Sequence, residues 1–379
     1  MELNLLGAYG AWAAALVSDE PAALSWRNPR WDDLEIWHAA AHERLRQRLA
    51  QPPVTAPPTA TVQRRFTYDG IDIEELSWQL PYGPPTQALF LKPANATGKL
   101  PAIMALHDHS GNKFFGYHKI TRTAHDIHPL MVRHHEHYYA GVPWANELAK
   151  RGYAVLVHDT FAFGSRRVLV ADTPQVIRGD VTDPAWEDVD GIERYNRWAA
   201  NHESIMAKSL FCAGTTWPGV WLTDDQAALD VLCARDDVDA ARIGCCGLSG
   251  GGLRSVFLAG LDNRIACSVT VGMMSTWRDY LLNKSHTHTW MIYVPLLAHD
   301  LDYPEILGLR TPKPALVLNN NEDQLFTLPE MERANQILTE VYAKAGAGAH
   351  YRASFYPGPH KFDLPMQAEA FAWLDQWLQ

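Results

Sequence analysis

The sequence predicts an α/β fold built on a mostly parallel central sheet with helices on both faces. Two observations lead to this class. Beyond residue 100, short apolar runs alternate with amphipathic stretches, and one of these runs ends in a glycine-rich turn around a serine. Short runs that are apolar throughout are typical of parallel strands covered on both faces. Their alternation with helices implies right-handed crossovers between parallel strands.

The expected elements follow one another in three groups. Residues 1–51 are expected to be helical, because large apolar residues recur every three or four positions. Three β-like runs, at 62–68, 71–79 and 88–92, are separated by turn residues that favour antiparallel pairing. Strands of the parallel part are then expected at 102–106, 154–158, 243–246, 266–271, 315–318 and 353–356, with helices at 227–235, 253–261, 329–345 and 365–378. Thr223 and Gln226 form a capping-box pattern ahead of the helix at 227–235.

The domain organisation is expected to be simple. Residues 1–58 form an N-terminal helical arm with a proline-rich connector, and residues 59–379 form one α/β domain. Two stretches, 113–140 and 161–222, interrupt the alternation of strands and helices. Both are expected to be insertions over the mouth of a site, and 161–222 is expected to be cap-like.

Composition limits the classes of function. The chain has 379 residues, 47% of them hydrophobic, and a formal net charge of -10, which argues against binding to nucleic acid or to an anionic membrane. The five cysteines show no CxxC spacing and are expected to be buried free thiols. The apolar stretch 5–17 has only Glu2 before it and no cleavage site before Asp19 and Glu20, unlike a signal peptide. We expect a soluble, cytoplasmic protein with no membrane partner, whose oligomeric state is open, a homodimer included.

The most informative motif surrounds Ser249. Residues 244–252 read Gly-Cys-Cys-Gly-Leu-Ser-Gly-Gly-Gly, so Ser249 lies in Gly-x-Ser-x-Gly after an apolar run and before a helical stretch. A strand, a sharp turn and a helix form the setting in which a serine hydroxyl is presented as a nucleophile. Gly247 and Gly250 remove side chains that would collide in such a turn. Ser249 is therefore the candidate nucleophile.

A serine hydroxyl is a weak nucleophile at neutral pH, so it needs a base and an acid that orients the base. The loop after the strand 315–318 holds Glu322 and Asp323, and the Pro/Gly-framed loop 357–362 presents His360. Such loops meet at the carboxyl edge of a parallel sheet. We expect His360 to be the base and prefer Asp323 as the acid, because Asp is the commoner partner. Glu322 would then be a solvated loop residue.

Negative charge that develops on a carbonyl oxygen needs hydrogen-bond donors. The first expected donor is the backbone N–H of Gly250, which follows the nucleophile. The second is expected in the loop 107–113, and we assign it to the backbone N–H of His109, with Ser110 as the alternative. The side chains of His107 and Asp108 are expected to brace this loop.

These motifs resemble those of a known family. The runs 106–113 and 152–166, the Gly-Leu-Ser-Gly-Gly turn and the loops of Asp323 and His360 resemble the dienelactone hydrolase-like branch of the α/β-hydrolases, with the closest likeness to its acetyl xylan esterase-like members. The likeness covers about residues 85–379 and implies a carboxylic ester hydrolase without a cofactor. Dienelactone hydrolases proper have a cysteine at the position of Ser249, which disfavours dienelactone as substrate. Acetyl xylan esterase-like members suggest an acetylated sugar.

Several further residues are candidates for contact with substrate. An aromatic face can stack on a sugar or an aryl group, and His288 is expected beside the pocket. The tryptophans expected near the mouth of the site are Trp217, Trp221, Trp277 and Trp290. Arg122 and the pair Arg166-Arg167 could hold a substrate carboxylate or form structural ion pairs. The histidine-rich segment 125–137 matches no zinc spacing, so we expect a loop scaffold and no metal.

Together these observations predict a serine carboxylic ester hydrolase that uses Ser249, His360 and Asp323 and passes through an acyl-enzyme intermediate. Its substrate would be a small-molecule or carbohydrate ester. Two alternatives stay open. A peptidase of the prolyl-peptidase type would need an acidic anchor for a peptide amine, and no acidic cluster is obvious. A catalytically inactive binding protein on the same fold would not need the complete set of triad candidates.

Overall fold

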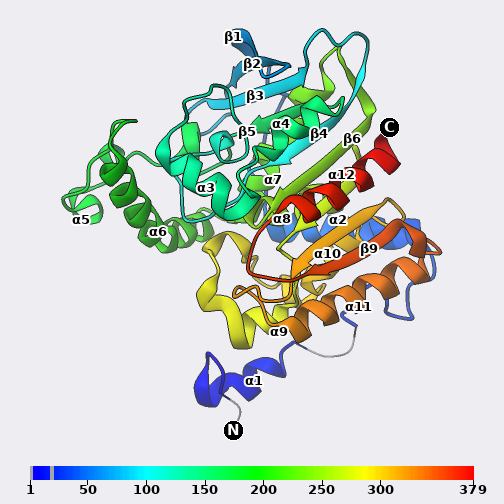
Figure 1. The fold of residues 1–379 in the computed structure, drawn as a ribbon. Coiled ribbons are helices and arrows are strands. Elements are labelled where there is room, and N and C mark those ends of the chain that lie inside the picture. The colour runs from blue at the N-terminus through cyan, green and yellow to red at the C-terminus, as the bar shows by residue number, and fades with distance from the viewer. Residues whose placement is uncertain (1–2, 18–20) are drawn as a thin grey trace.

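A computed structural model of the chain describes residues 3–17 and 21–379. The described residues form one nine-stranded sheet with the strand order β1-β2-β3-β5-β4-β6-β7-β8-β9 (Figure 1). The strands are β1 (Thr61–Tyr68), β2 (Ile71–Trp78), β3 (Thr86–Pro93), β4 (Leu100–Leu106), β5 (Ala154–His158), β6 (Val238–Leu248), β7 (Ile265–Val271), β8 (Ala315–Asn320) and β9 (Tyr351–Tyr356).

The sheet is parallel from β5 to β9 and antiparallel at its other edge, where β1, β2 and β3 form a meander and β3 pairs with β5. Each predicted strand is found, with its ends shifted by a few residues, and the predicted antiparallel pairing of the first three is confirmed. The largest difference is in β6, which begins five residues earlier than predicted. Its first half is partly exposed and therefore lacks the apolar signal.

Helices cover both faces of the sheet, as predicted. Alternate residues of β4 separate the two cores: Met104 packs with α7 and α8 on one face, and Ile103 packs with α4 and α12 on the other. The helices are α1 (Gly10–Ala14), α2 (Leu34–Leu49), α3 (Pro129–Tyr139), α4 (Trp144–Lys150), α5 (Gln175–Arg178), α6 (Val189–Cys212), α7 (Trp217–Cys233), α8 (Gly250–Leu261), α9 (Trp277–Asp279), α10 (Tyr303–Gly308), α11 (Leu328–Lys344) and α12 (Leu364–Leu378).

The N-terminal region differs from the predicted continuous helical arm. Residues 21–33 are turns and irregular chain between α1 and α2, and only α2 is a long helix. Asp33 caps α2 by accepting hydrogen bonds from the N–H groups of Glu35 and Ile36. The buried face of α2, with Trp37 and Leu45, belongs to the same core as α7 and α8. Thus α2 is part of the body of the α/β domain.

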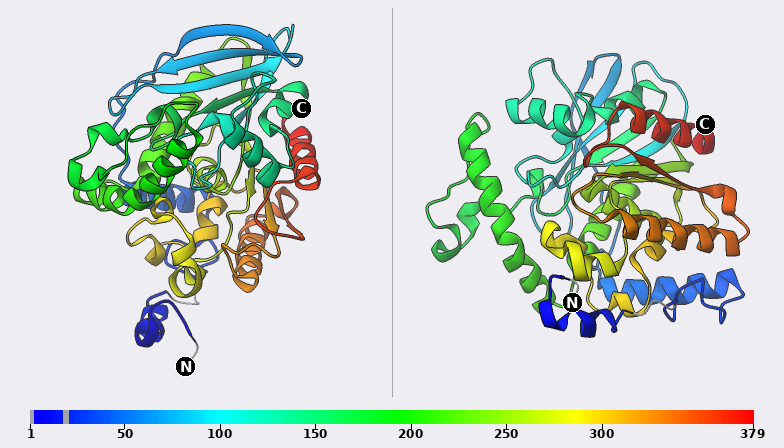
Figure 2. Two further views of the ribbon diagram at one scale, coloured as in Figure 1. Left: turned by 60° about the vertical axis from the view of Figure 1, so that its left-hand side comes forward. Right: turned by 60° about the horizontal axis from the view of Figure 1, so that its bottom comes forward.

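The two stretches that interrupt the alternation pack on each other. Phe114, Phe115 and Leu130 of the first stretch share a small core with Tyr195 and Trp198 of the second. Figure 2 shows that α5 and α6, both in the second stretch, project to one side of the sheet.

The boundary predicted at residue 222 lies inside a helix. Helix α7 begins at Trp217, with Thr216 accepting a hydrogen bond from the N–H of Gly219 as its N-cap. Thr223 therefore lies within α7, where its hydroxyl donates to the carbonyl of Gly219 four residues earlier, and the predicted capping box is wrong.

Three further expectations concern the whole chain. Cys245, Cys246 and Cys267 are buried free thiols in β6 and β7, as predicted. The prediction of burial is wrong for the other two, because Cys233 of α7 is half-buried and Cys212 of α6 is exposed. Among the residues described, there is no helix with the length and apolar character needed to cross a bilayer. Glu2, Asp19 and Glu20, which flank the apolar stretch 5–17, lie outside the described residues.

The position of α2 in the main core leads to a stability prediction. Trp37 is fully buried and its indole Nε1 donates a hydrogen bond to the carbonyl of Leu24. Replacing Trp37 by Ala should lower the free energy of unfolding by about 3–5 kcal/mol, because it leaves a cavity in the core. Ile36, its neighbour on α2, is 62% exposed, so Ile36→Ala should change stability by less than about 0.5 kcal/mol. Urea unfolding of both variants checks this, and equal losses would place α2 outside the core.

Candidate active site

Ser249 lies at the turn between β6, which ends at Leu248, and α8, which begins at Gly250. Its backbone has φ 57° and ψ -117°, a conformation that a residue with a side chain adopts at a cost of about 1–3 kcal/mol. A Cβ on Gly247 would lie 2.6 Å from the carbonyl oxygen of Leu106, and one on Gly251 would collide with the same atom. The main chain at the end of β4 therefore packs directly against the main chain of β6 and α8 at this turn.

His360 and Asp323 lie in loops after β9 and β8, and the structure brings them together. His360 Nδ1 is 2.6 Å from Asp323 Oδ2, and Asp323 Oδ1 accepts a hydrogen bond from the N–H of Leu325. Because Nδ1 donates to the carboxylate, Nε2 is the nitrogen that can accept a proton. Nε2 is buried and has no hydrogen-bond partner among the residues described.

Glu322 lies beside Asp323 but serves the loop. Its carboxylate accepts a hydrogen bond from the N–H of Gly358, so it ties the loop after β8 to the loop of His360. Gly272, at the end of β7, has φ +57°, and a Cβ there would lie 2.8 Å from Cε1 of His360. The imidazole therefore packs closely against the main chain at the end of β7. Glycine is required at position 272 both by the positive φ and by the close approach of the imidazole.

Ser249, His360 and Asp323 line one cavity of about 490 Å³ together with Gly250 and His109. A Cβ on Gly250 would lie 2.8 Å from the backbone nitrogen of His109, so the loop after β4 runs beside the turn. Neither the N–H of Gly250 nor that of His109 donates a hydrogen bond to another of the described residues. Two unpaired N–H groups beside a serine hydroxyl suit an oxygen that gains negative charge.

Buried side chains hold the loop after β4 in place. Lys119 Nζ donates to the carbonyl oxygens of Asp108 (2.8 Å) and His109 (3.0 Å). The Asp108 carboxylate accepts from Tyr139 Oη and pairs with His134. Burial opposes the charge of Asp108, yet His134 and Lys119 keep its pKa well below the usual range. Burial also lowers the pKa of Lys119 to about 7. The side chains of His107 and Asp108 were expected to brace this loop, and the side chain of Asp108 makes contacts that do so.

Glu203 was not predicted and lies at the centre of a second set of contacts. Its Oε1 accepts from His109 Nε2 (2.7 Å) and from Lys113 Nζ, and its Oε2 accepts from Thr289 Oγ1 (2.6 Å). His109 Nδ1 accepts from the N–H of Gly111, so Nε2 carries the ring proton. Burial penalises the Glu203 carboxylate, but His109 and Lys113 outweigh it and hold its pKa below the usual range. Glu203 thus ties α6 to the loop after β4.

The predicted substrate-binding residues are scattered. His288 lines the cavity, where its Nε2 lies 2.8 Å from the carbonyl oxygen of Leu325. Trp217 and Trp221 are buried in the main core because α7 begins earlier than predicted. Trp277 lies in the same core, where its indole N–H donates to the carbonyl of Leu301. Trp290 is exposed and is not among the residues that line the cavity. Arg122 lines a separate cavity near α4. These five residues do not meet at the cavity.

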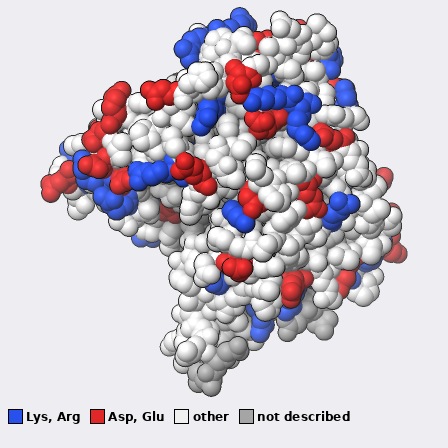
Figure 3. Space-filling model, viewed as in Figure 1, with Lys and Arg blue, Asp and Glu red and all other residues white. Residues whose placement is uncertain are grey.

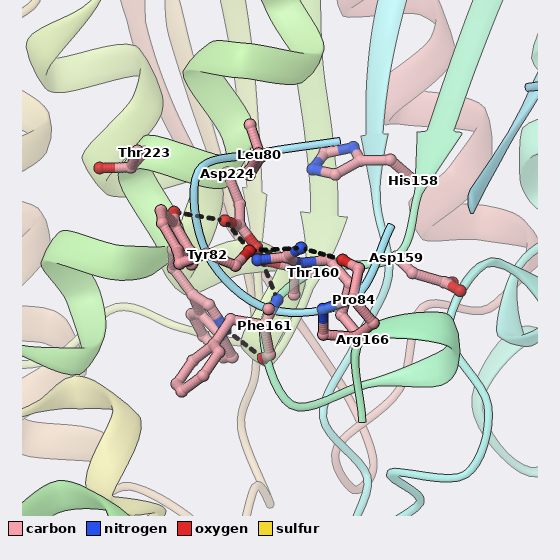
Figure 4. Close-up of polar contacts among 12 residues, drawn as sticks. Leu80, Tyr82, Pro84, His158, Asp159, Thr160, Phe161, Arg166, Thr223 and Asp224 are labelled. Atoms are coloured by element: carbon pink, nitrogen blue, oxygen red, sulfur yellow. Dashed lines mark hydrogen bonds and ion pairs between the residues drawn. The ribbon is translucent and has the colours of Figure 1, made fainter. Parts of the chain in front are cut away.

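Arg166 is part of a buried structural network. Its guanidinium pairs with Asp224 of α7 at 3.1 Å and donates to the carbonyl of Pro84 at 2.7 Å (Figure 4). Tyr82 Oη and the N–H of Phe161 also donate to Asp224. Arg166 therefore joins the loop after β5 to α7 and to the segment before β3, and of the two predicted roles it takes the structural one.

The histidine-rich segment 125–137 supports loops. His128 accepts from the N–H of Leu130 at the start of α3, His134 pairs with Asp108, and His135 contacts the carbonyl of His118. Within residues 3–17 and 21–379, no group of three or more His, Cys, Asp or Glu side chains is arranged to hold a metal ion.

The sheet order, the helices on both faces and a strained serine at the turn from β6 to α8 define the α/β-hydrolase fold. No protein-family model matches the chain. It is 29% identical over 294 residues to "Putative hydrolase YtaP" of Bacillus subtilis strain 168, covering 77% of this chain and 83% of that protein.

Solved structures support the same class. A structure described as a putative acetyl xylan esterase from Bacteroides fragilis superposes with a TM-score of 0.68 at 18% identity, covering 93% of this chain and 83% of that one. A glucuronoyl esterase from Solibacter usitatus gives a TM-score of 0.61 at 14% identity, with 94% of both chains covered. The predicted α/β-hydrolase fold and the likeness to an acetyl xylan esterase-like structure are confirmed. The likeness to dienelactone hydrolases stays a prediction.

The contacts of Glu203 lead to a second stability prediction. Glu203→Gln removes the charge that pairs with the buried Lys113, so the free energy of unfolding should fall by about 3–5 kcal/mol. Glu193 lies on the same helix, and its pair with Arg133 is largely exposed, so Glu193→Gln should cost less than about 0.5 kcal/mol. Thermal and urea unfolding of both variants checks this. A Glu203→Gln protein as stable as the wild type would mean that the cluster does not hold the loop.

Proposed function

We propose that this chain is a serine carboxylic ester hydrolase in which Ser249 is the nucleophile, His360 the general base and Asp323 the acid that orients it. The observation that carries the proposal is the 2.6 Å contact between His360 Nδ1 and Asp323, which leaves Nε2 unpaired on the cavity that Ser249 also lines. A base oriented in this way next to a serine is the arrangement used for acyl transfer.

The proposed reaction has two halves. In the first, His360 Nε2 takes the proton of Ser249 as its Oγ bonds to the acyl carbon, and the N–H groups of Gly250 and His109 stabilise the oxyanion. Collapse of the tetrahedral intermediate breaks the bond to the alcohol, which receives that proton from His360. In the second, His360 deprotonates a water molecule that attacks the acyl-enzyme, and Ser249 regains its proton as the carboxylic acid leaves.

We further propose a neutral, hydroxylated ester as substrate, a carbohydrate acetyl ester being the simplest case. None of the described residues that line the cavity is a lysine or an arginine, so a negatively charged substrate would find no permanently charged cation among them. Burial lowers the pKa of His288 to about 4, which keeps the ring neutral. With Nε2 donating to Leu325, His288 Nδ1 can accept a hydrogen bond from a substrate hydroxyl. Leu248, Leu253 and Met273 line the same cavity and suit a short acyl chain.

The carboxylates of the cavity argue against the peptidase alternative. Asp108 is engaged by His134, Tyr139 and the nearby charge of Lys119, and Glu203 is engaged by His109, Lys113 and Thr289. Both side chains are buried and already paired, Asp108 through Oδ2 alone, so neither offers an exposed anchor for a peptide amine. The alternative of an inactive binding protein is tested by the variants that follow.

The first variant tests the nucleophile. Ser249→Ala should abolish hydrolysis of p-nitrophenyl acetate and labelling by a fluorophosphonate, because the Ser249 hydroxyl lies at the turn directly before the N–H of Gly250 and lines the cavity together with His360. Ser110 lines the same cavity, so Ser110→Ala is the matched control and should still be labelled. Intact-protein mass spectrometry measures the adduct. Labelling that survives in Ser249→Ala would refute the assignment of the nucleophile. If the wild-type protein turned over none of a panel of acetylated sugars, aryl esters and lactones, the result would favour the inactive binding protein.

The second variant tests the acid. Asp323→Asn should lower kcat by about 10³–10⁴-fold, because an amide cannot hold the imidazole in the tautomer that accepts the serine proton. Glu322→Gln removes an equal charge one residue away and should change kcat less than about threefold, since Glu322 contacts only the backbone of the neighbouring loop. Steady-state kinetics on p-nitrophenyl acetate compares the two, and the reverse ranking would make Glu322 the acid.

A further inference from the structure

An apolar segment at the N-terminal end of the described chain lies largely outside the body of the protein. Residues 3–17 contain no charged side chain. Leu3 is 96% exposed, Tyr9 71%, Trp12 64% and Leu16 53%. Figure 1 shows this segment, which includes α1, projecting from the body of the molecule, and Figure 3 shows that surface without acidic or basic side chains. Single exposed apolar residues are common, but a contiguous cluster of large ones marks an interaction surface.

The inner side of this segment is attached to a groove. The N–H of Leu5 donates to the carbonyl of Leu282, and Leu6 and Val17 line an apolar groove of about 430 Å³. The opposite walls of the groove come from residues 277–298 and include Trp277, Tyr280 and Val294. The segment is thereby fixed in direction, with Tyr9 and Trp12 on its outer side.

The rim of the groove is itself an exposed apolar site. Leu296 lines the groove, is 59% exposed and has φ +68°, a left-handed backbone conformation that is unusual for leucine. The backbone thus holds a large apolar side chain at the surface next to the projecting segment. One molecule therefore presents both a protruding apolar element and an apolar rim beside it.

We propose that residues 3–17 and the rim at Leu296 form a two-fold interface between two copies of this chain. In a two-fold contact each copy gives the same two surfaces, so the projecting segment of one copy covers the rim of the other and the reverse. Each copy carries a formal net charge of -10, and repulsion between copies is weakest where both contributing surfaces are uncharged.

A lipid surface is a poorer match for the same segment. Helices that lie in a membrane interface have a lysine- and arginine-rich polar face, whereas residues 3–17 have no basic residue and α1 has only five residues. A separate peptide is a poorer match as well, because a peptide in the groove would leave Tyr9 and Trp12, which do not line it, uncovered. A second copy is the occupant that uses both exposed surfaces.

The interface would lie next to the cavity described above. Residues 277–298 line the groove on one side, and Thr287, His288 and Thr289 from this stretch line the catalytic cavity. The proposed contact would therefore brace the stretch of chain that forms one wall of that cavity. The interface itself does not depend on the proposed reaction, so it is tested separately from activity.

Sedimentation equilibrium of the full-length protein tests the proposal. The wild type should have twice the mass of the chain, and Trp12→Glu and Leu296→Glu should each raise the dimer dissociation constant at least about tenfold, because each buries a charge in the apolar contact. Val176, on α5, is 87% exposed and apolar, so Val176→Glu is the matched control and should leave the dimer unchanged. Circular dichroism melting checks that the variants are folded.

Three results would overturn the proposal. A wild-type protein with the mass of one chain at all concentrations would exclude the dimer. A dimer unaffected by both Trp12→Glu and Leu296→Glu would place its interface elsewhere. The third result is a wild-type protein that has the mass of one chain and sediments with phosphatidylcholine vesicles. If Trp12→Glu abolished this vesicle binding, the occupant would be a lipid surface.

Discussion

Direct contact between main-chain segments keeps the strained backbone of Ser249 in place. The ends of β4, β6 and β7 meet at the start of α8, and glycines stand where side chains would separate them. A Cβ on Gly247 would approach Leu106, and one on Gly252 would lie 2.7 Å from the carbonyl oxygen of Val271. The same close approach places the backbone nitrogen of His109 next to Gly250. One packing constraint thus fixes both the serine hydroxyl and the N–H groups beside it.

Buried charged side chains reinforce that contact from outside. Arg254 of α8 pairs with Asp225 of α7, and His158 at the end of β5 contacts the same carboxylate. This group holds the helix that begins next to Ser249, while Glu203 and Asp108 hold the loop of His109. Buried ion pairs add little net stability, since desolvation offsets the attraction. Their directional contacts favour one arrangement of the loops, which a site that stabilises a developing charge requires.

Local patterns in the sequence were sufficient to predict the sheet and three of the residues that meet at the cavity. The strands of the parallel part were predicted because buried strands leave short apolar runs, and β1, β2 and β3 were predicted because turn residues separate three β-like runs. Ser249, Asp323 and His360 were predicted because each follows such a run, and parallel strands bring their carboxyl ends together. The preference for Asp323 over Glu322 agrees with the geometry around His360.

Features that depend on distant contacts could not be predicted. Glu203 lies in a helix with no local motif, and its partners His109, Lys113 and Thr289 are remote in sequence. The tryptophans were expected at the site because 161–222 read as an insertion, whereas Trp217 begins a core helix. Residues 1–51 read as an arm because periodicity reveals that a helix has a buried face but not what covers it, and α2 is covered by the main core.

The central claim is that Ser249 and the N–H groups of Gly250 and His109 act on one acyl centre. A crystal structure of the protein after reaction with a fluorophosphonate tests it most directly. The account predicts phosphorus bonded to Ser249 Oγ, with the phosphoryl oxygen accepting hydrogen bonds from both N–H groups and His360 Nε2 facing the adduct. An adduct on another residue, or a phosphoryl oxygen directed away from both N–H groups, would contradict it.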